Sequence, residues 1–335
     1  MFFLLKKDFI KTKEFSYVDY MKLLMACCVI GIHTNLSCVF LNTTAKEIVN
    51  LLFSMAVPYF FICSGFFLFR NDKKADINYR IIHYVKGILF MYMIWTFIYL
   101  PFTVYSYCID GLNFRQSFLA FVRGFLFIGE HTYSWPLWYL LALITAIVLI
   151  YCMKQLRFKP LMIAFVGFIM FFLGHYINYL HTNSFDLIGI KSLIDIYFKI
   201  FQNTRNGLFI GLFYVSLGLI IAHFGRIKNP IVNICIIVIG GYLAYQKSFV
   251  GMPLVIFSLF SLTLSEPRFT KGAVTCRKLS TIFYFTHMLL IAPVYISKLQ
   301  FTPWLLYIIV ISVLIVFSLI VLRYRETRWY KYLFK

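Results

Sequence analysis

Apolar residues occur in long runs that short polar segments separate. About 20 apolar residues span the hydrocarbon core of a bilayer, and ten runs approach or exceed that length. They cover residues 16–40, 47–69, 86–108, 135–153, 160–178, 207–223, 230–246, 251–265, 280–297 and 303–323. A backbone in lipid must satisfy its own hydrogen bonds, so each run is expected to be a helix. The pattern therefore predicts an all-α integral membrane protein with about ten transmembrane helices.

The composition agrees with this prediction. Of the 335 residues, 61% are hydrophobic and 13% are charged, whereas soluble domains are about half apolar and a quarter charged. The formal net charge is +20, but the basic residues lie in short clusters between apolar runs. A nucleic-acid-binding protein gathers them on one solvated face. We therefore expect a multi-pass membrane protein, with the lipid bilayer and not nucleic acid as partner.

The basic residues also predict the orientation. One alternating set of polar segments holds 23 of the 32 Lys and Arg residues, and the other set holds 8. The basic set comprises residues 1–15, 70–86, 154–159, 224–229, 266–278 and the tail from 323. Basic loops stay on the cytoplasmic side, so both termini are expected there. The chain then divides into a cytoplasmic segment 1–15, a transmembrane domain 16–323 and a basic cytoplasmic tail 324–335.

Two outward segments, 109–134 and 179–206, are longer than turns. Each contains an amphipathic stretch, and in residues 190–201 the apolar side chains recur at helical spacing with charged residues opposite. This pattern is typical of a helix that lies in the membrane interface.

The first apolar run carries the best candidates for chemistry: Asp19, Lys22 and His33. Ionisable residues inside a membrane are costly and are functional candidates by default. Eleven positions make about three helical turns, so Lys22 and His33 share one stripe about 16 Å apart. Asp19 lies three positions before Lys22 and is expected to pair with it. In the functional interpretation His33 transfers protons, because imidazole titrates near neutral pH. In the structural interpretation the Lys22 side chain extends to the membrane interface and His33 forms a hydrogen bond to a carbonyl of a neighbouring helix.

These residues resemble a known signature. Asp19-x-x-Lys22-x10-His33 is similar to the Arg/Lys-x10-His motif of the acyltransferase-3 family, multipass membrane proteins of which many O-acetylate bacterial surface glycans. Four family-like pieces follow in the family's order over residues 16–323: VPYFFICSGF from Val57, WTFIY from Trp95, LWYL from Leu137 and YFTH from Tyr284. The family's Arg-x-x-Arg pair after the second helix is absent. Pro136 stands where relatives often place a histidine.

The resemblance implies a function. An acyl-CoA, with acetyl-CoA as the expected donor, would bind on the cytoplasmic side, and a polysaccharide or lipid-linked saccharide outside would accept the acyl group. His33 would act as general base or carry the acyl group itself. Lys22 would position His33 or contact the donor's phosphates, and Asp19 would orient Lys22. His287 would face the active cavity or pack against another helix.

Further candidates each have a structural alternative. Arg80 and Lys86, in the basic loop 70–86, suit the phosphates of coenzyme A but also obey the positive-inside rule. Candidate substrate contacts, each with another use, are Ser64, Glu130, His131, Trp138 and Tyr139. Ser64-Gly65 would also allow two helices to pack closely. Glu130-His131 would also fit an ordinary solvated loop. Trp138 and Tyr139 would also fit the aromatic belt at the membrane interface. No Cys/His cluster has metal-site spacing, so no metal is expected.

Two other classes of function remain open from the sequence. Charges near the membrane midplane and short helices also serve transporters of small solutes or glycan intermediates. A membrane-embedded partner subunit without chemistry is the third possibility. Transfer or hydrolysis of an acyl donor by the purified chain separates the enzyme from both.

Overall fold

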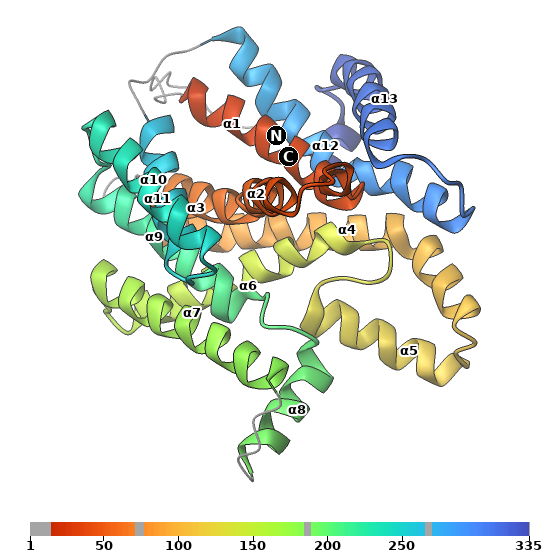
Figure 1. The fold of residues 1–335 in the computed structure, drawn as a ribbon, viewed down its shortest axis with the longest axis horizontal. Coiled ribbons are helices and arrows are strands. Elements are labelled where there is room, and N and C mark those ends of the chain that lie inside the picture. Colours follow the sequence, from red (N-terminus) through yellow and green to blue (C-terminus); the bar gives the residue numbers. More distant parts are fainter. Residues whose placement is uncertain (1–14, 71–76, 184–188, 265–269, 335) are drawn as a thin grey trace, which may run out of the picture.

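A computed structural model of the chain describes residues 15–70, 77–183, 189–264 and 270–334, and its regular elements there are all helices (Figure 1). In chain order they are α1 (Ser16–His33), η1 (Leu36–Val39), α2 (Thr43–Ser54), α3 (Ala56–Phe69), α4 (Ile77–Ile109), α5 (Phe114–Arg123), η2 (Gly124–Ile128), η3 (Trp135–Leu137), α6 (Trp138–Gln155), α7 (Pro160–Thr182), α8 (Ile190–Phe201), η4 (Gly207–Gly211), α9 (Leu212–Phe224), α10 (Pro230–Tyr245), α11 (Gly251–Thr263), α12 (Lys271–Ile296), α13 (Pro303–Arg323) and α14 (Arg328–Phe334).

Every one of the ten apolar runs contains a helix, which confirms the all-α character of the described chain. Seven helical segments of the described residues are long and apolar enough to cross a membrane, α2 with α3 counting as one. Helices α10 and α11 are apolar but shorter, and α1 contains the charged residues Asp19 and Lys22. A multi-pass membrane protein follows. The number of ten spans and the cytoplasmic termini stay predictions.

Several predicted boundaries are wrong by more than a turn. The first helix ends at His33 instead of continuing to residue 40, because Asn35 adopts a left-handed conformation with φ 54°. The second run is broken at Met55 into α2 and α3. Helix α4 has 33 residues and begins at Ile77. Residues 77–86, which the sequence predicts as part of a loop, therefore belong to this helix. Charged residues such as Arg80 and Lys86 are good helix formers although they are not apolar.

Helices α1 and α12 lie side by side and run in the same direction. At one end, the Tyr20 hydroxyl is 2.8 Å from Oγ1 of Thr270, just before α12. At the other end, the Tyr295 hydroxyl donates to the His33 carbonyl at 2.5 Å. Residues 250 or more positions apart therefore lie next to each other at both ends of α1, and this pairing builds the site described below.

Close contact between α3 and α9 depends on glycine. A Cβ on Gly65 would clash with the Val215 carbonyl oxygen, and one on Gly218 would clash with the Ile62 carbonyl oxygen. Small residues let membrane helices approach to backbone contact. The packing interpretation of Ser64-Gly65 is thus confirmed for Gly65, and Ser64 beside it is directed elsewhere.

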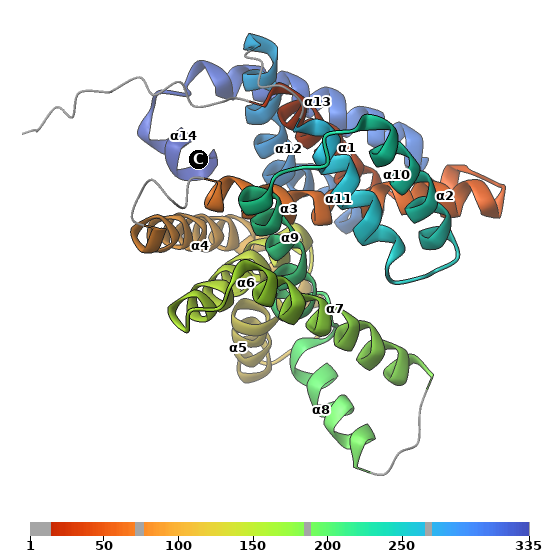
Figure 2. The same ribbon diagram turned by 90° about the vertical axis from the view of Figure 1, so that its left-hand side faces the viewer.

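The two amphipathic stretches are helical, as predicted. Helix α8 projects from the lower end of the molecule in Figure 2, beside the end of α7. Its side chains Leu193 and Ile196 are 68% and 55% exposed. Exposed apolar side chains on a helix of this kind suit the lipid interface.

Residues 324–335 are not simply a basic tail, because they include α14. This helix packs on α4: the Trp95 indole N–H donates to the Leu333 carbonyl at 2.9 Å, and the rings of Trp95 and Phe334 lie 5.8 Å apart. Tyr330 and Phe334 are buried. A helix of this length needs such packing to be stable.

The predicted orientation gives a direct test. A cysteine introduced at Asn183, after α7, should react with a membrane-impermeant maleimide in intact cells. A cysteine introduced at the exposed Arg328, on α14, should react only after the membrane is opened, because it lies on the cation-rich side. Peptide-resolved mass spectrometry separates these thiols from the native ones. The reverse pattern would invert the orientation.

Candidate active site

Two histidines from distant parts of the chain meet at the centre of the site. His33 is the last residue of α1, and His287 lies in the middle of α12. Their ring centroids are 5.3 Å apart. The Trp135 ring also stacks on the His33 ring, with the centroids 5.6 Å apart. His287 is fully buried, whereas His33 is partly accessible. The His287 ring thus lies against His33 of the neighbouring helix α1, and His287 is not among the residues that line the cavities described below.

A hydrogen bond to the backbone determines which ring nitrogen of His287 carries the proton and which can accept one. Its Nδ1 is 2.9 Å from the Phe283 carbonyl, and a carbonyl only accepts, so Nδ1 carries the proton. In the neutral ring Nε2 is then an acceptor. This Nε2 is buried and has no hydrogen-bond partner within the part of the chain that the structure describes. Buried polar atoms are normally satisfied, so a free acceptor next to His33 points to a ligand or a proton partner.

The backbone at the end of α1 is fixed by neighbours. The Tyr295 hydroxyl donates to the His33 carbonyl and is itself 3.4 Å from the Asn35 side-chain amide. Thr34 donates its hydroxyl to the Ile30 carbonyl at 3.0 Å. The bond from Tyr295 satisfies the His33 carbonyl at the end of the helix, and the Ile30 carbonyl also accepts the Thr34 backbone N–H.

One wall beside the histidines consists of Glu130, Trp138 and Arg205. Arg205 forms an ion pair with Glu130 at 3.2 Å, and its guanidinium lies over the Trp138 ring at 4.8 Å. Burial raises the pKa of the Glu130 carboxyl, and the charge of Arg205 offsets part of this effect. Arg205 also acts electrostatically on His33. Sequence reasoning counted Arg205 only toward topology and missed this position.

His131 lies apart from the two central histidines. Its ring stacks on Phe121 at 4.8 Å, and its Nδ1 is 3.2 Å from the Tyr107 hydroxyl. Burial lowers the pKa of His131 to about 4, so the ring is neutral at physiological pH. The prediction of an ordinary solvated loop at Glu130-His131 is therefore wrong, because both side chains fold back against the helices.

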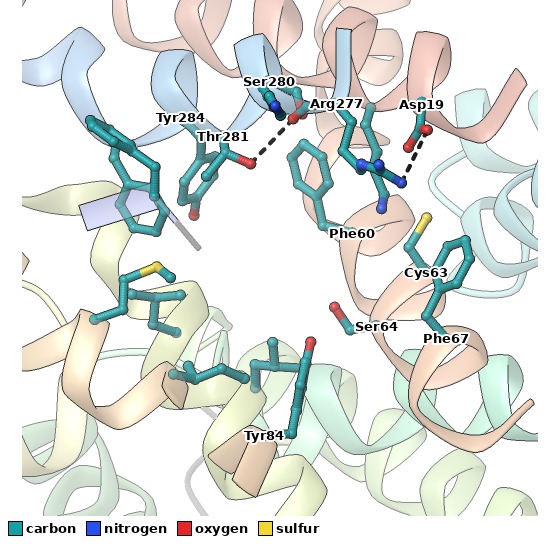
Figure 3. A pocket seen from close by; sticks show the side chains of 18 of the residues that line it. Asp19, Phe60, Cys63, Ser64, Phe67, Tyr84, Arg277, Ser280, Thr281 and Tyr284 are labelled. Atoms are coloured by element: carbon teal, nitrogen blue, oxygen red, sulfur yellow. Dashed lines mark hydrogen bonds and ion pairs between the residues drawn. The ribbon is translucent and has the colours of Figure 1, made fainter. Parts of the chain in front are cut away.

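A cavity of about 720 Å³ opens at the opposite end of α1 and α12. Side chains from α1, α3, α4 and α12 surround it (Figure 3). Its charged lining is mostly basic: Lys22, Arg70, Arg277, Lys278, Arg325 and Lys331, with Asp19 and Glu326 as the acids. Apart from Lys22, these cations come from segments predicted to be cytoplasmic. The excess of positive charge favours an anionic ligand.

Asp19 and Lys22 both line this cavity, but their contacts differ from the expectation. The sequence predicts Lys22 as the partner of Asp19, whereas the ion pair observed joins the buried Asp19 to Arg277 at 3.6 Å (Figure 3). The Lys22 ammonium lies over the Phe67 ring at 4.8 Å. Arg277 lies 258 positions from Asp19 in the chain, and the parallel packing of α1 on α12 brings the two side chains close.

Hydroxyl groups lie between the cavity and the histidines. Ser64 and Tyr139 are hydrogen-bonded at 3.0 Å, and both line the cavity together with Tyr284. The Tyr284 hydroxyl donates to the Pro136 carbonyl at 2.6 Å, and its ring lies 6.4 Å from His287. Tyr284 therefore borders the cavity and the histidine pair at once. A ligand in the cavity would have its inner end near this tyrosine.

Comparison with known proteins identifies the family. A family model described as an acyltransferase domain matches residues 15–323. The chain belongs to the acyltransferase-3 family. The matched residues cover nearly the whole sequence. They include all five sequence motifs that resemble those of the family.

Two curated proteins are similar over part of the chain. One, named amino-acid racemase, from Enterococcus faecalis, is 26% identical over 215 residues, which are 62% of this chain and 28% of that protein. The other, named serine/alanine racemase, from Enterococcus gallinarum, is 25% identical over 272 residues, 74% of this chain and 37% of that protein. The chain thus matches about a third of the length of these relatives. No solved structure matches.

Not all the predicted site residues converge. His33, His287 and Trp138 lie at one centre, and Asp19, Lys22, Ser64 and Tyr139 line the basic cavity. Arg80 and Lys86 do not line that cavity. The Arg80 guanidinium donates to the Leu68 carbonyl, and Lys86 is exposed on the opposite side of α4. Among the described residues no group of His, Cys, Asp and Glu could hold a metal ion.

Proposed function

We propose that the protein is a membrane O-acyltransferase of the cytoplasmic (inner) membrane, which transfers an acyl group from acyl-CoA to a hydroxyl of a cell-surface or lipid-linked polysaccharide. Acetyl-CoA is the proposed donor. The observation that carries the proposal is the arrangement of the His33–His287 pair, which lies beyond the inner end of a cation-lined cavity, with Tyr284 bordering both.

The cavity suits coenzyme A in charge and size. A diphosphate and a ribose phosphate are strongly anionic, and arginine and lysine are the side chains that bind phosphate. Ligand pockets commonly enclose about 300–1,000 Å³, and this one measures about 720 Å³. With the phosphates among Arg277, Lys278 and Arg325 near the mouth, the thioester would extend toward Ser64 and Tyr284 at the inner end.

The histidine pair can supply the proton chemistry of acyl transfer. The acceptor oxygen attacks the thioester carbonyl carbon, a ring nitrogen of His33 takes the hydroxyl proton, the carbon–sulfur bond breaks, and the proton passes to the departing thiolate. In the second route the His33 nitrogen attacks first, coenzyme A leaves, and the acceptor hydroxyl then takes the acyl group from the ring. Nε2 of His287 can accept a hydrogen bond from protonated His33 in either route.

Lys22 would act through its charge. Replacement by arginine keeps the cation in the cavity, so we expect Lys22→Arg to retain much of the activity. Lys22→Ala should retain little. Initial rates of acyl transfer by purified variants, at saturating acceptor and varied acyl-CoA, measure both. Equal loss in both variants would mean that the ammonium geometry itself is needed, since the two cations differ in shape and hydrogen bonding.

A transfer assay tests the proposed function itself. The purified chain in nanodiscs is mixed with radiolabelled acetyl-CoA and surface glycan from cells that lack the protein. We expect alkali-labile label on the glycan and free coenzyme A in equal amounts. Absence of both products with correctly folded protein would refute the proposal. Counterflow of a labelled solute through proteoliposomes, without transfer, would instead support the transporter.

A further inference from the structure

A second cavity, of about 430 Å³, lies between α7 and the segment that leads into η4. Five of its eight lining residues have polar side chains, and the full lining is Gly174, His175, Asn178, Asn203, Thr204, Arg205, Phe209 and Ile210. It shares none of these residues with the basic cavity. Helix α7 leads into the polar segment 179–206, which the sequence predicts to lie outside and which contains residues 203–206, so this cavity is predicted to lie on the face opposite the proposed donor site.

The turn that lines the cavity is held rigidly. The Asn206 side chain accepts hydrogen bonds from the backbone N–H groups of Leu208 and Phe209 and so caps the helical turn η4. Its amide nitrogen donates to the Tyr197 hydroxyl at 2.7 Å, and that hydroxyl donates to the Asn203 carbonyl at 3.0 Å. A binding group on a preorganised turn loses little entropy when a ligand binds.

The polar groups of the cavity suit a neutral ligand with many hydroxyls. Asn178 and Asn203 each offer donors and an acceptor, and Thr204 offers a hydroxyl. His175 donates from Nδ1 to the Phe171 carbonyl at 3.0 Å, so in the neutral ring its Nε2 accepts. The one cation, Arg205, is already paired with Glu130 at 3.2 Å. An anion would find little uncompensated charge, whereas vicinal hydroxyls would find both donors and acceptors.

Arg205 connects this cavity to the histidine centre. Its side chain lines the cavity and also lies over Trp138, three positions after the Trp135 that stacks on His33. A ligand held at Arg205 therefore has one end beside the reacting residues.

We propose that the cavity between α7 and residues 203–210 binds the saccharide portion of the acyl acceptor and directs one of its hydroxyls past Arg205 toward His33. This inference rests on the proposed function for the reaction, and on the cavity alone for binding.

Substitutions on α7 test the inference by kinetics. His175→Ala combined with Asn178→Ala removes two hydrogen-bonding side chains from an exposed stretch of α7. We expect the KM for the glycan acceptor to rise about tenfold or more, with kcat at saturating acceptor within about threefold of the wild type. The matched control is Asn183→Ala, an exposed asparagine after the same helix that lies outside the cavity. An unchanged acceptor KM in the double variant would overturn the proposal.

A binding measurement separates this inference from the proposed function. A cysteine introduced at Thr204 is labelled with a maleimide, and its modification is followed by peptide-resolved mass spectrometry. Delipidated glycan and the lipid-linked fraction from cells lacking the protein are added in separate arms. Protection by both supports a saccharide site, and protection by the lipid-linked fraction alone supports it with that fraction as the source. Equal labelling in every arm overturns the site. Protection without any acyl transfer would leave the site and refute the proposed function.

Discussion

Replacing His33 by alanine should lower the rate of acyl transfer by about 10²–10⁴, the contribution expected of a general base. The ring of His33 is the partly accessible member of a pair whose other member is fully buried, so it is the one that an acceptor can reach. His33 is the last residue of α1, so truncation of its side chain does not create a cavity in the middle of the helix. Initial rates of the purified variant in nanodiscs measure the loss.

A matched control accompanies this variant. His223→Ala removes an exposed histidine near the end of α9, in neither cavity lining, and should leave the rate unchanged. Label from acetyl-CoA that stays on wild-type protein without acceptor, and disappears in His33→Ala, would assign the covalent route. Near-normal transfer by His33→Ala would remove His33 from the mechanism.

The second large effect concerns donor binding. Lys278→Gln together with Arg325→Gln removes two cations from the basic cavity without touching the Asp19–Arg277 ion pair. Charge-assisted contacts to phosphate contribute more than neutral ones, but those near solvent are weakened by salt. We therefore expect the KM for acetyl-CoA to rise by about tenfold to a hundredfold, with a smaller change in the acceptor KM. The rise should shrink as ionic strength increases.

The control for this pair removes the same number of cations from the same predicted side. Lys86 and Arg328 are exposed and do not line the cavity, so Lys86→Gln with Arg328→Gln should leave the donor KM close to wild type. If both pairs raise the donor KM equally, the effect is one of overall surface charge. If neither does, coenzyme A binds elsewhere.

Much of the fold could be predicted from the sequence because membrane insertion depends on local composition. A run of apolar residues in lipid has to form a helix, and all ten runs contain one. The helix Ile190–Phe201 was likewise predictable, since its periodicity is contained in the element itself. Boundaries were harder. Helix α4 begins nine residues before its apolar run 86–108, because helix propensity does not end where hydrophobicity ends.

Elements that depend on distant partners could not be predicted. Nothing in residues 324–335 indicates a docked helix, since α14 is stabilised by Trp95 on α4. Arg205 is one cation in a polar segment until Glu130 and Trp138 are placed around it. Motif spacing identified Lys22 and His33 as one stripe of α1, but it did not indicate which side chains of other helices surround each end.

The sequence by itself determined that this chain is an all-helical membrane protein, and it supplied the five motifs of its family in order, because both properties are written in short stretches of residues. The tertiary structure decided which of these residues act together. Parallel packing of α1 on α12 brings His33 to His287 and Asp19 to Arg277. These contacts join residues about 250 positions apart, and they form only where side chains from separate helices fill the same space.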